Sequence, residues 1–219
     1  MRFDILTLFP DEIMPMLTAS IIGRGIRRGH LTVAAHQIRD FTENRQKQVD
    51  DYPYGGGHGM VMTAQPLYGC LQYVKETFGD GLVIVMSPRG ERFTQKTARE
   101  LVKREHIILV CGRYEGIDQR FIDKCADMEL SLGDFVITGG EIAAQAVADA
   151  TARLIPGVLA DETGFERESH WDSDGTLEHP QYTRPAEWMG ERVPDALMNG
   201  NHAEIEKWKR ENTQVTECS

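Results

Sequence analysis

Long hydrophobic runs, paired cysteine spacings and an excess of basic residues are all missing from this chain of 219 residues. Its unbroken apolar runs are only a handful of residues long, whereas a membrane-spanning helix needs about 20. The amino terminus has neither the longer apolar stretch nor the cleavage site of a secretory signal. The four cysteines lack the spacing of metal or redox sites. We therefore expect a cytoplasmic protein with free thiols and no membrane partner.

The motifs of several common enzyme classes are also missing. No G-x-G-x-x-G follows the first predicted strand, and there is no Walker A sequence, no H-E-x-x-H and no G-x-S-x-G. These absences argue against an ordinary dinucleotide-binding fold, a P-loop nucleotidase, a zinc protease and an α/β-hydrolase. The seven histidines are scattered without metal-ligand spacing, so the residues themselves predict no metal site.

Charge is unevenly distributed along the chain. The formal net charge of −10 argues against a generally basic nucleic-acid-binding surface. Residues 21–47 nevertheless carry six Lys or Arg against two acids, a balance of +4, and residues 159–206 carry three Arg against twelve acids, a balance of −9. Such asymmetry is compatible with local phosphate binding on one face. A solvated surface of uneven charge fits the same pattern.

Alternating apolar and amphipathic segments predict a largely parallel α/β sheet. Strands are expected at 2–8, 31–38, 82–86 and 107–110, and helices at about 65–77, 94–104, 117–125 and 141–154. In the last helix, a stripe of apolar residues is predicted to face the core: Ile142, Ala146, Val147, Ala150 and Leu154. After Leu159 the composition shifts to acids, Gly, Ser and Pro. We interpret 160–176 as a linker and the remainder as a small helical unit.

Three apolar segments run directly into glycine-containing polar loops. Residues 107–110 lead into CGRYEGID (111–118), 82–86 into SPRGE (87–91), and 135–137 into TGGE (138–141). Ligands of α/β sheets bind at the carboxyl ends of strands, so the three loops are candidates for one shared ligand site. Backbone groups suit a purine edge, and Glu115 and Glu141 suit positive charge; S-adenosylmethionine has both features. The alternative is that these glycines only form tight turns.

Six motifs in a fixed order identify a family resemblance. They are DDYPYGGGHGM (50–60), SP (87–88), CGRYEGID (111–118), LGDFVITGGE (132–141), IPGVL (155–159) and PQYTRP (180–185). The chain closely resembles the bacterial tRNA (guanine-N1)-methyltransferases, the TrmD family of the SPOUT superfamily, from Met1 to about Arg210. His58 stands where the family commonly has Pro.

The resemblance implies a fold and partners that composition does not. It implies an α/β fold of SPOUT type, with a parallel sheet and a deep trefoil knot, followed by a small helical C-terminal domain. The expected boundaries are 1–159 for the methyltransferase domain, 160–176 for the linker and 177–219 for a tRNA-binding domain. The implied partners are the anticodon stem-loop of tRNA and a second copy of the chain, with the active site at the subunit interface and no role for DNA.

The same resemblance implies S-adenosylmethionine as the methyl donor and assigns its contacts by position. These are Ser87, Pro88, Gly112, Tyr114, Glu115, Leu132, Gly133, Asp134, Phe135, Val136, Ile137, Gly139 and Gly140. Val85 and Met86 are expected to add apolar walls. The family is thought to need Mg²⁺, but no residue spacing here identifies a magnesium site.

The implied reaction is methylation of N1 of the guanosine at tRNA position 37. N1 carries a proton at neutral pH, so a general base is needed, and negative charge builds on O6 as that proton leaves. Arg153 occupies the family's arginine position and is expected to stabilise O6; its alternative role is a salt bridge at the end of the helix. Glu168 followed by Ser169 matches the family's Asp-Ser pair and is the predicted base. The linker is two residues longer than in the family pattern, which keeps Asp172 as a rival.

Two other functions remain open from the sequence. Another SPOUT enzyme, acting on a ribose hydroxyl or a different base, would share the donor pocket without needing Arg153 and a carboxylate. A non-catalytic RNA-binding module that retains the pocket is the second alternative.

Overall fold

The computed structural model describes residues 1–161, 165, 168–171 and 175–215. The chain divides into two compact units, Met1–Ala160 and Asp161–Ser219. Among the described helices, none is both long enough and apolar enough to cross a membrane.

The first unit is built on a five-stranded parallel sheet with the strand order β2-β1-β6-β5-β7. The strands are β1 (Arg2–Thr7), β2 (Thr32–Gln37), β5 (Leu82–Arg92), β6 (His106–Cys111) and β7 (Met128–Ser131). Two short antiparallel strands, β3 (Asp50–Asp51) and β4 (Val61–Met62), flank the 52–60 loop. The predicted α/β class with a parallel sheet is confirmed.

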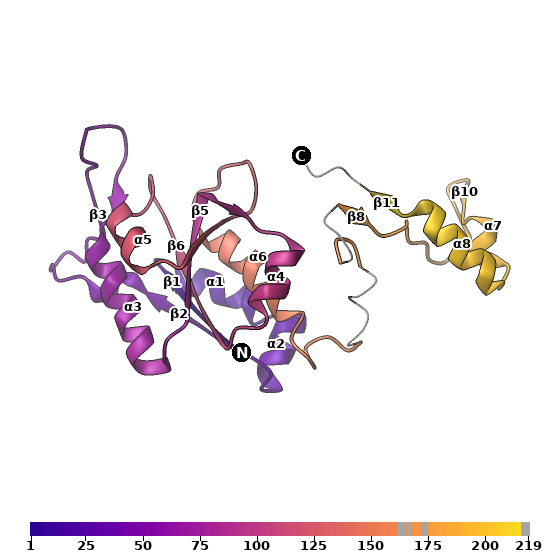
Figure 1. The fold of residues 1–219 in the computed structure, drawn as a ribbon, viewed down its shortest axis with the longest axis horizontal. Coiled ribbons are helices and arrows are strands. Elements are labelled where there is room, and N and C mark those ends of the chain that lie inside the picture. The colour runs from indigo at the N-terminus through magenta and orange to yellow at the C-terminus, as the bar shows by residue number, and fades with distance from the viewer. Residues whose placement is uncertain (162–164, 166–167, 172–174, 216–219) are drawn as a thin grey trace. The chain divides into compact units, whose positions relative to one another are not determined.

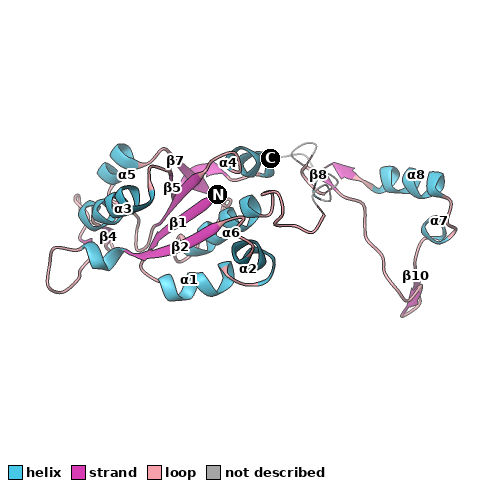
Figure 2. Ribbon diagram, turned by 90° about the horizontal axis from the view of Figure 1, so that it is seen from below, coloured by secondary structure: helices cyan, strands magenta, loops and turns pink. Residues whose placement is uncertain are grey.

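Helices cover both faces of this sheet (Figures 1 and 2). On one face lie α1 (Pro10–Leu17), α4 (Gln95–Leu101) and α6 (Glu141–Ala152), with α2 (Ser20–Arg27) beside them; on the other lie α3 (Ala64–Phe78), α5 (Gln119–Cys125) and the 3-10 turn η1 (Ile38–Phe41). Strand β6 shows why two layers form. All six of its residues are buried, with Ile107 and Leu109 in one core and Ile108 and Val110 in the other. Successive side chains of a strand point to opposite faces, so an unbroken apolar strand needs cover on both sides.

Two details of the sheet differ from the sequence prediction. The expected apolar strand at 135–137 is wrong, because this segment lies in a loop and Phe135 and Val136 are exposed. The strand that leads to that loop is β7, Met128–Ser131, whose short and partly charged sequence gave no signal. Strand β5 continues to Arg92, six residues beyond its predicted end at Met86, because it pairs with β7 a second time.

The buried face of α6 also differs from the predicted stripe. Ile142 is 57% exposed, and the buried positions are Glu141, Ala143, Ala144, Val147, Ala148, Thr151 and Ala152. The helix is packed through small residues against α1, α4 and the sheet. Val147 and Leu154 of the predicted stripe are buried, but Ile142 is exposed, because close helix packing here relies on alanine.

A buried carboxylate lies within the sheet layer. Asp4 has no exposed surface and accepts hydrogen bonds from Arg2, from His36 Nε2 at 2.6 Å and from His106 Nε2 at 2.8 Å. Burial alone raises the pKa of Asp4, but the hydrogen bonds and charges of His36 and Arg2 outweigh that effect and hold the pKa below its ordinary value. The group therefore stabilises the folded state in its ionised form.

The second unit contains short elements. They are β8 (Thr176–Leu177), β9 (Glu187–Trp188), β10 (Glu191–Arg192), α7 (Asp195–Met198), α8 (His202–Asn212) and β11 (Gln214–Val215). Strand β8 pairs with β11, and β9 pairs with β10 as a hairpin. His179 and Tyr182 pack edge-on against Trp208 of α8, with ring centroids about 6 Å away.

Replacing Asp4 tests the role of the buried carboxylate. We expect Asp4→Asn to lower the free energy of unfolding by about 3 kcal/mol at pH 7, because Arg2 loses its buried ionic partner. Because the pKa of Asp4 is lower in the folded chain than in the unfolded chain, Asp4 stabilises the fold at pH values above its unfolded-state pKa of about 3.9. This stabilisation is lost as the pH falls through the folded-state pKa. The difference between the two proteins should therefore hold from pH 7 to about pH 5 and shrink below about pH 3.9.

Urea denaturation at several pH values measures this difference. The matched control is Asp40→Asn, which removes an exposed pair with Lys47 and should cost less than about 1 kcal/mol. Equal stability of Asp4→Asn and the wild-type chain at pH 7 would contradict the assignment.

Candidate functional site

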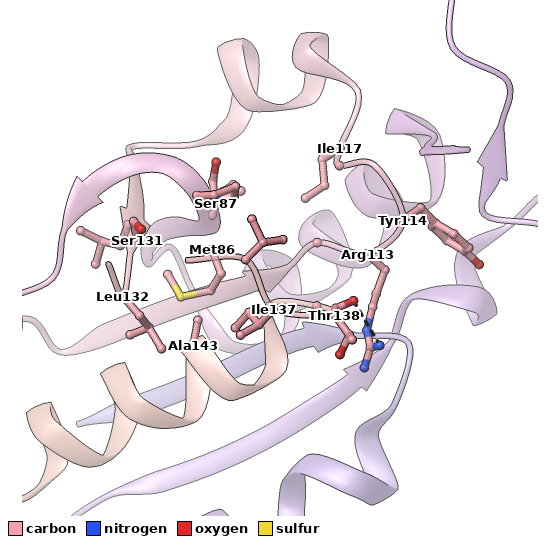
Figure 3. A pocket seen from close by; sticks show the side chains of 18 of the residues that line it. Met86, Ser87, Arg113, Tyr114, Ile117, Ser131, Leu132, Ile137, Thr138 and Ala143 are labelled. Atoms are coloured by element: carbon pink, nitrogen blue, oxygen red, sulfur yellow. Dashed lines mark hydrogen bonds between the residues drawn. The ribbon is translucent and has the colours of Figure 1, made fainter. Parts of the chain in front are cut away.

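Three loops meet around a cavity of about 340 Å³ at the carboxyl ends of β5, β6 and β7 (Figure 3). Among the described residues, the cavity is lined by Val85, Met86, Ser87, Pro88, Gly112, Arg113, Tyr114, Glu115, Gly116, Ile117, Ile122, Leu130, Ser131, Leu132, Phe135, Val136, Ile137, Thr138, Gly139, Gly140 and Ala143. The carboxyl edge of a parallel sheet is where α/β proteins bind ligands. The three glycine-containing loops therefore form one site.

The structure brings together eleven of the thirteen predicted donor contacts. They are Ser87, Pro88, Gly112, Tyr114, Glu115, Leu132, Phe135, Val136, Ile137, Gly139 and Gly140. Gly133 and Asp134 lie outside the lining, although they belong to the same loop. Gly133 accepts a hydrogen bond from Ser131 Oγ at 3.1 Å, and Asp134 pairs with Arg92 at 2.7 Å, so both shape the loop.

Neither predicted catalytic residue is among the residues that line the cavity. Arg153 caps the carboxyl end of α6 and is half-buried. The pocket is at the other end of this helix, and twelve residues at 1.5 Å each separate Glu141 from Arg153 by about 18 Å. Glu168 belongs to the second unit and is half-buried. Asp172 is outside the described residues.

An irregularity in β5 places Ser87 and Pro88 at the cavity. Met86 and Glu91 both align with Leu130 of β7, so residues 87–90 leave the ladder between them. Gly90 closes this bulge: a Cβ there would lie 2.4 Å from the carbonyl carbon of Glu129. Bulges redirect side chains and are common beside functional sites. The bulge thus turns Ser87 and Pro88 out of the sheet toward the pocket.

The 113–116 turn is held by the segment that follows the 52–59 loop. Tyr114 has a φ of +59°, a left-handed conformation that is strained for a residue with a side chain. The Glu115 N–H donates to Met60 O at 2.9 Å, and Gly116 O accepts from the Met62 N–H at 2.9 Å. These bonds fix the strained turn, and Figure 3 shows the Tyr114 ring directed away from the other labelled side chains.

Gly139 and Gly140 are required for close approach rather than for turning. Neither has a positive φ. The Gly140 N–H donates to Gly112 O at 2.8 Å, and a Cβ on Gly140 would lie 2.8 Å from the Cα of Cys111. A Cβ on Gly139 would lie 2.2 Å from Nε of Arg113. The idea that these glycines only make tight turns is therefore wrong at these two positions.

Arg113 is the main residue of the lining that the sequence reasoning missed. Its Nε donates to Glu141 Oε2 at 2.9 Å, and its NH1 group donates to Thr138 O at 3.4 Å, as the dashed line in Figure 3 shows. The guanidinium carbon lies 4.4 Å from the centroid of the Phe9 ring. An arginine inside a glycine-containing loop could have indicated a site residue. Its partner Glu141, however, is 28 residues away in the chain. Only the tertiary structure pairs them.

The thiol beside the cavity is not a nucleophile. Burial, followed by the negative charge of Glu141, raises the pKa of the Cys111 thiol well above its ordinary value. The thiolate is the reactive form, so Cys111 stays protonated and acts as a small core residue. In the part of the chain that the structure describes, no group of three or more His, Cys, Asp or Glu could hold a metal ion.

Comparison with known proteins assigns the chain to a family. The model of the tRNA (guanine-1)-methyltransferase family TrmD matches residues 1–217. The chain belongs to the TrmD family. A tRNA (guanine-N(1)-)-methyltransferase of Clostridium perfringens is 54% identical over 213 residues, covering 97% of this chain and 88% of the relative. One of Geobacter sulfurreducens is 52% identical over 211 residues, covering 96% and 85%.

A solved structure agrees with this assignment. The crystal structure of the tRNA (m1G37) methyltransferase from Aquifex aeolicus matches with a TM-score of 0.81 and 42% identity, over 95% of this chain and 87% of that one. The predicted family, the tRNA (guanine-N1)-methyltransferase activity and the α/β fold are thus confirmed. As a TrmD methyltransferase, the chain takes its methyl group from S-adenosylmethionine.

The pocket fits that donor. Its volume falls within the range of small-molecule sites. Leu132, Ile137 and Met86 provide apolar walls, and the lining contains glycines, Gly112, Gly116, Gly139 and Gly140, in which no side chain covers the backbone. Glu115 supplies a carboxylate for a cationic ligand. The cavity thus combines the apolar, hydrogen-bonding and charged surfaces that an adenosyl sulfonium needs.

Proposed function

We propose that this chain methylates N1 of guanosine 37, next to the anticodon of tRNA, with S-adenosylmethionine bound in the cavity at the ends of β5, β6 and β7. The observation that carries the proposal is the convergence of three motif loops on one cavity, whose lining holds the Glu115 carboxylate and an Arg113 guanidinium that is paired with Glu141. Position 37 is the site named for the Aquifex aeolicus enzyme. A tRNA substrate places the reaction in the cytoplasm.

The chemistry requires two groups outside the cavity. Guanine N1 becomes nucleophilic only when its proton leaves, and a positioned carboxylate contributes about 10²–10⁴-fold to such a step. We assign this role to Glu168. Arg153 stabilises the charge that develops on O6. When bound, the donor would supply an electrophilic methyl group: its bond from sulfur to the methyl carbon would break with the electron pair left on sulfur, and the N1 lone pair would form the new bond. Glu168 would take the proton that leaves N1.

A second copy of the chain completes the site in this proposal. Arg153 is about 18 Å from the pocket end of α6 within one chain, too far to touch the same bound guanine. Apolar surface next to the pocket supports an interface: Phe135 is 56% exposed, Val136 86% and Ile142 57%. The proposed homodimer buries this surface and brings Arg153 of one subunit to the cavity of the other.

The trefoil knot is part of the same proposal. After β7, at the edge of the sheet, the chain returns across the ends of β5 and β6, where Gly140 bonds to Gly112 and packs against Met86. It then enters α6 beneath the sheet (Figure 2). This return of the chain across its own strands supports a trefoil knot, in which the segment before α6 passes through a loop formed earlier in the chain.

Exposed arginines support a contact with tRNA phosphates. Arg24, Arg27 and Arg28 lie on α2 and its carboxyl cap, and all three are exposed. Phosphate contacts of this kind position an RNA without reading its sequence. The requirement for Mg²⁺ remains a prediction from the family, without an assigned site.

Two transcripts that differ at position 37 test the proposed function. We expect the full chain to transfer tritiated methyl groups to a tRNA transcript with guanosine 37 and not to one with adenosine 37. Equal incorporation into both would indicate another target base or a ribose hydroxyl. Binding without incorporation would indicate an RNA-binding module.

Two variants distinguish the candidate bases. Glu168→Gln should slow single-turnover methyl transfer by about 10²–10⁴-fold, and Asp172→Asn should leave it nearly unchanged. Both substitutions remove one linker carboxylate, so each is the control for the other. Near-normal chemistry in Glu168→Gln would remove Glu168 from the mechanism.

Mixed dimers test whether two subunits share one site. Arg153→Ala keeps the pocket, whereas Gly139→Val fills the space of Arg113; each homodimer should be inactive. Random co-assembly of the two should restore roughly a quarter of the wild-type activity, because half of the dimers are mixed and each has one intact site. No recovery, with mixed dimers shown by mass spectrometry, would place Arg153 and the cavity of one subunit in the same site.

A further inference from the structure

Glu141 is a buried carboxylate that the proposed reaction does not use. It is 7% exposed and does not line the cavity. Oε1 accepts from Thr7 Oγ1 at 2.8 Å, and Oε2 accepts from Arg113 Nε at 2.9 Å. Thr7 is fully buried at the end of β1, and its oxygen accepts in turn from the Phe9 N–H at 3.0 Å. The carboxylate is therefore held rigidly from two elements.

The loop in front of Glu141 leaves room for its pair with Arg113. A Cβ at Gly139 would lie 2.2 Å from Arg113 Nε and 2.6 Å from Glu141 Oε2. Arg113 also bonds to Thr138 O and stacks over Phe9. The Arg113 guanidinium thus lies against the wall of the cavity, and the Glu141 carboxylate balances its charge.

This arrangement sets the charge of the cavity. Arg113 and Glu115 are the two residues of the lining that are charged at neutral pH. Glu141 neutralises Arg113. The Glu115 side chain packs on Gly59, and its carboxylate has no hydrogen-bond or ion-pair partner in the described part of the chain. The formal charges of Arg113, Glu115 and Glu141 add up to a net charge of about −1 at the cavity.

Methyl transfer changes the charge of the ligand that this cavity holds. The bond from sulfur to the methyl carbon breaks, its electron pair stays on sulfur, and the sulfonium becomes a neutral thioether. At neutral pH the donor therefore carries one more positive charge than the product, S-adenosylhomocysteine. A cavity with net negative charge binds the donor more tightly than an uncharged cavity of the same shape.

We propose that Glu141 is a positioning residue that acts through Arg113: it holds the guanidinium against the wall and cancels its charge, so that the cavity selects the cationic donor over the neutral product. This inference rests on the proposed function, because it needs the donor in this cavity. It assigns to the last residue of the TGGE motif a role in donor selection and product release.

Glu141→Gln tests the charge directly. Glutamine still accepts from Thr7, but it leaves Arg113 without an ionic partner. The ratio of dissociation constants, donor over product, measured by isothermal titration calorimetry at low salt, should rise about tenfold. The double variant Arg113→Gln with Glu141→Gln removes both charges and should return the ratio to the wild-type value. Equal weakening of both ligands in Glu141→Gln would show a merely structural role and overturn the proposal.

A control and a variant-free measurement complete the test. Glu100→Gln removes an exposed partner of Lys103 on α4 and should leave the ratio unchanged. In the wild-type chain, raising the salt concentration should increase the same ratio several-fold, because screening weakens only the charge-dependent part. A ratio that does not change with salt overturns the proposal even if Glu141→Gln fails to fold. Failure of the wild-type chain to bind either ligand contradicts the proposed function instead.

Discussion

The contact between Gly140 and the end of β6 is the constraint on which the site depends. The returning chain passes so close to Cys111 and Gly112 that its backbone donates directly to the Gly112 carbonyl. No side chain fits between the two segments. This contact fixes where α6 begins, and it places the 132–140 loop over the ends of β5 and β6.

Side chains fix the remainder of the cavity wall. The pair formed by Arg113 and Glu141 ties the β6 loop to the start of α6, and Thr7 connects that pair to β1. The bulge at 87–90 provides the third side. Strand β1, the β6 loop and the start of α6 thus meet through a small number of polar contacts. Buried polar networks of this kind make a site rigid when every member is satisfied.

The sequence predicted the parts of this structure that depend on local patterns. The strands at 82–86 and 107–110 and the helix at 65–77 were correct, because continuous apolar runs and 3.6-residue periodicity report directly on burial. It failed where burial is decided by small residues or by distant partners. In α6 and the turn after it, Val147 and Leu154 are buried as predicted, but Ile142 is exposed because alanines form most of the buried face. Strand β7 was missed because a four-residue segment that contains a glutamate has no clear apolar pattern. Arg113 was missed because its partner lies on another element.

The length of α6 sets the separation of Glu141 and Arg153 at its two ends. Its first residue, Glu141, pairs with Arg113 of the cavity lining, and Arg153 caps its last turn. Inserting or deleting one residue between them rotates one end relative to the other by about 100°. The helix therefore fixes the distance and the angle between the Glu141–Arg113 pair and Arg153. An insertion or a deletion in α6 would therefore move Arg153 relative to the cavity, whereas changes to its exposed side chains would not.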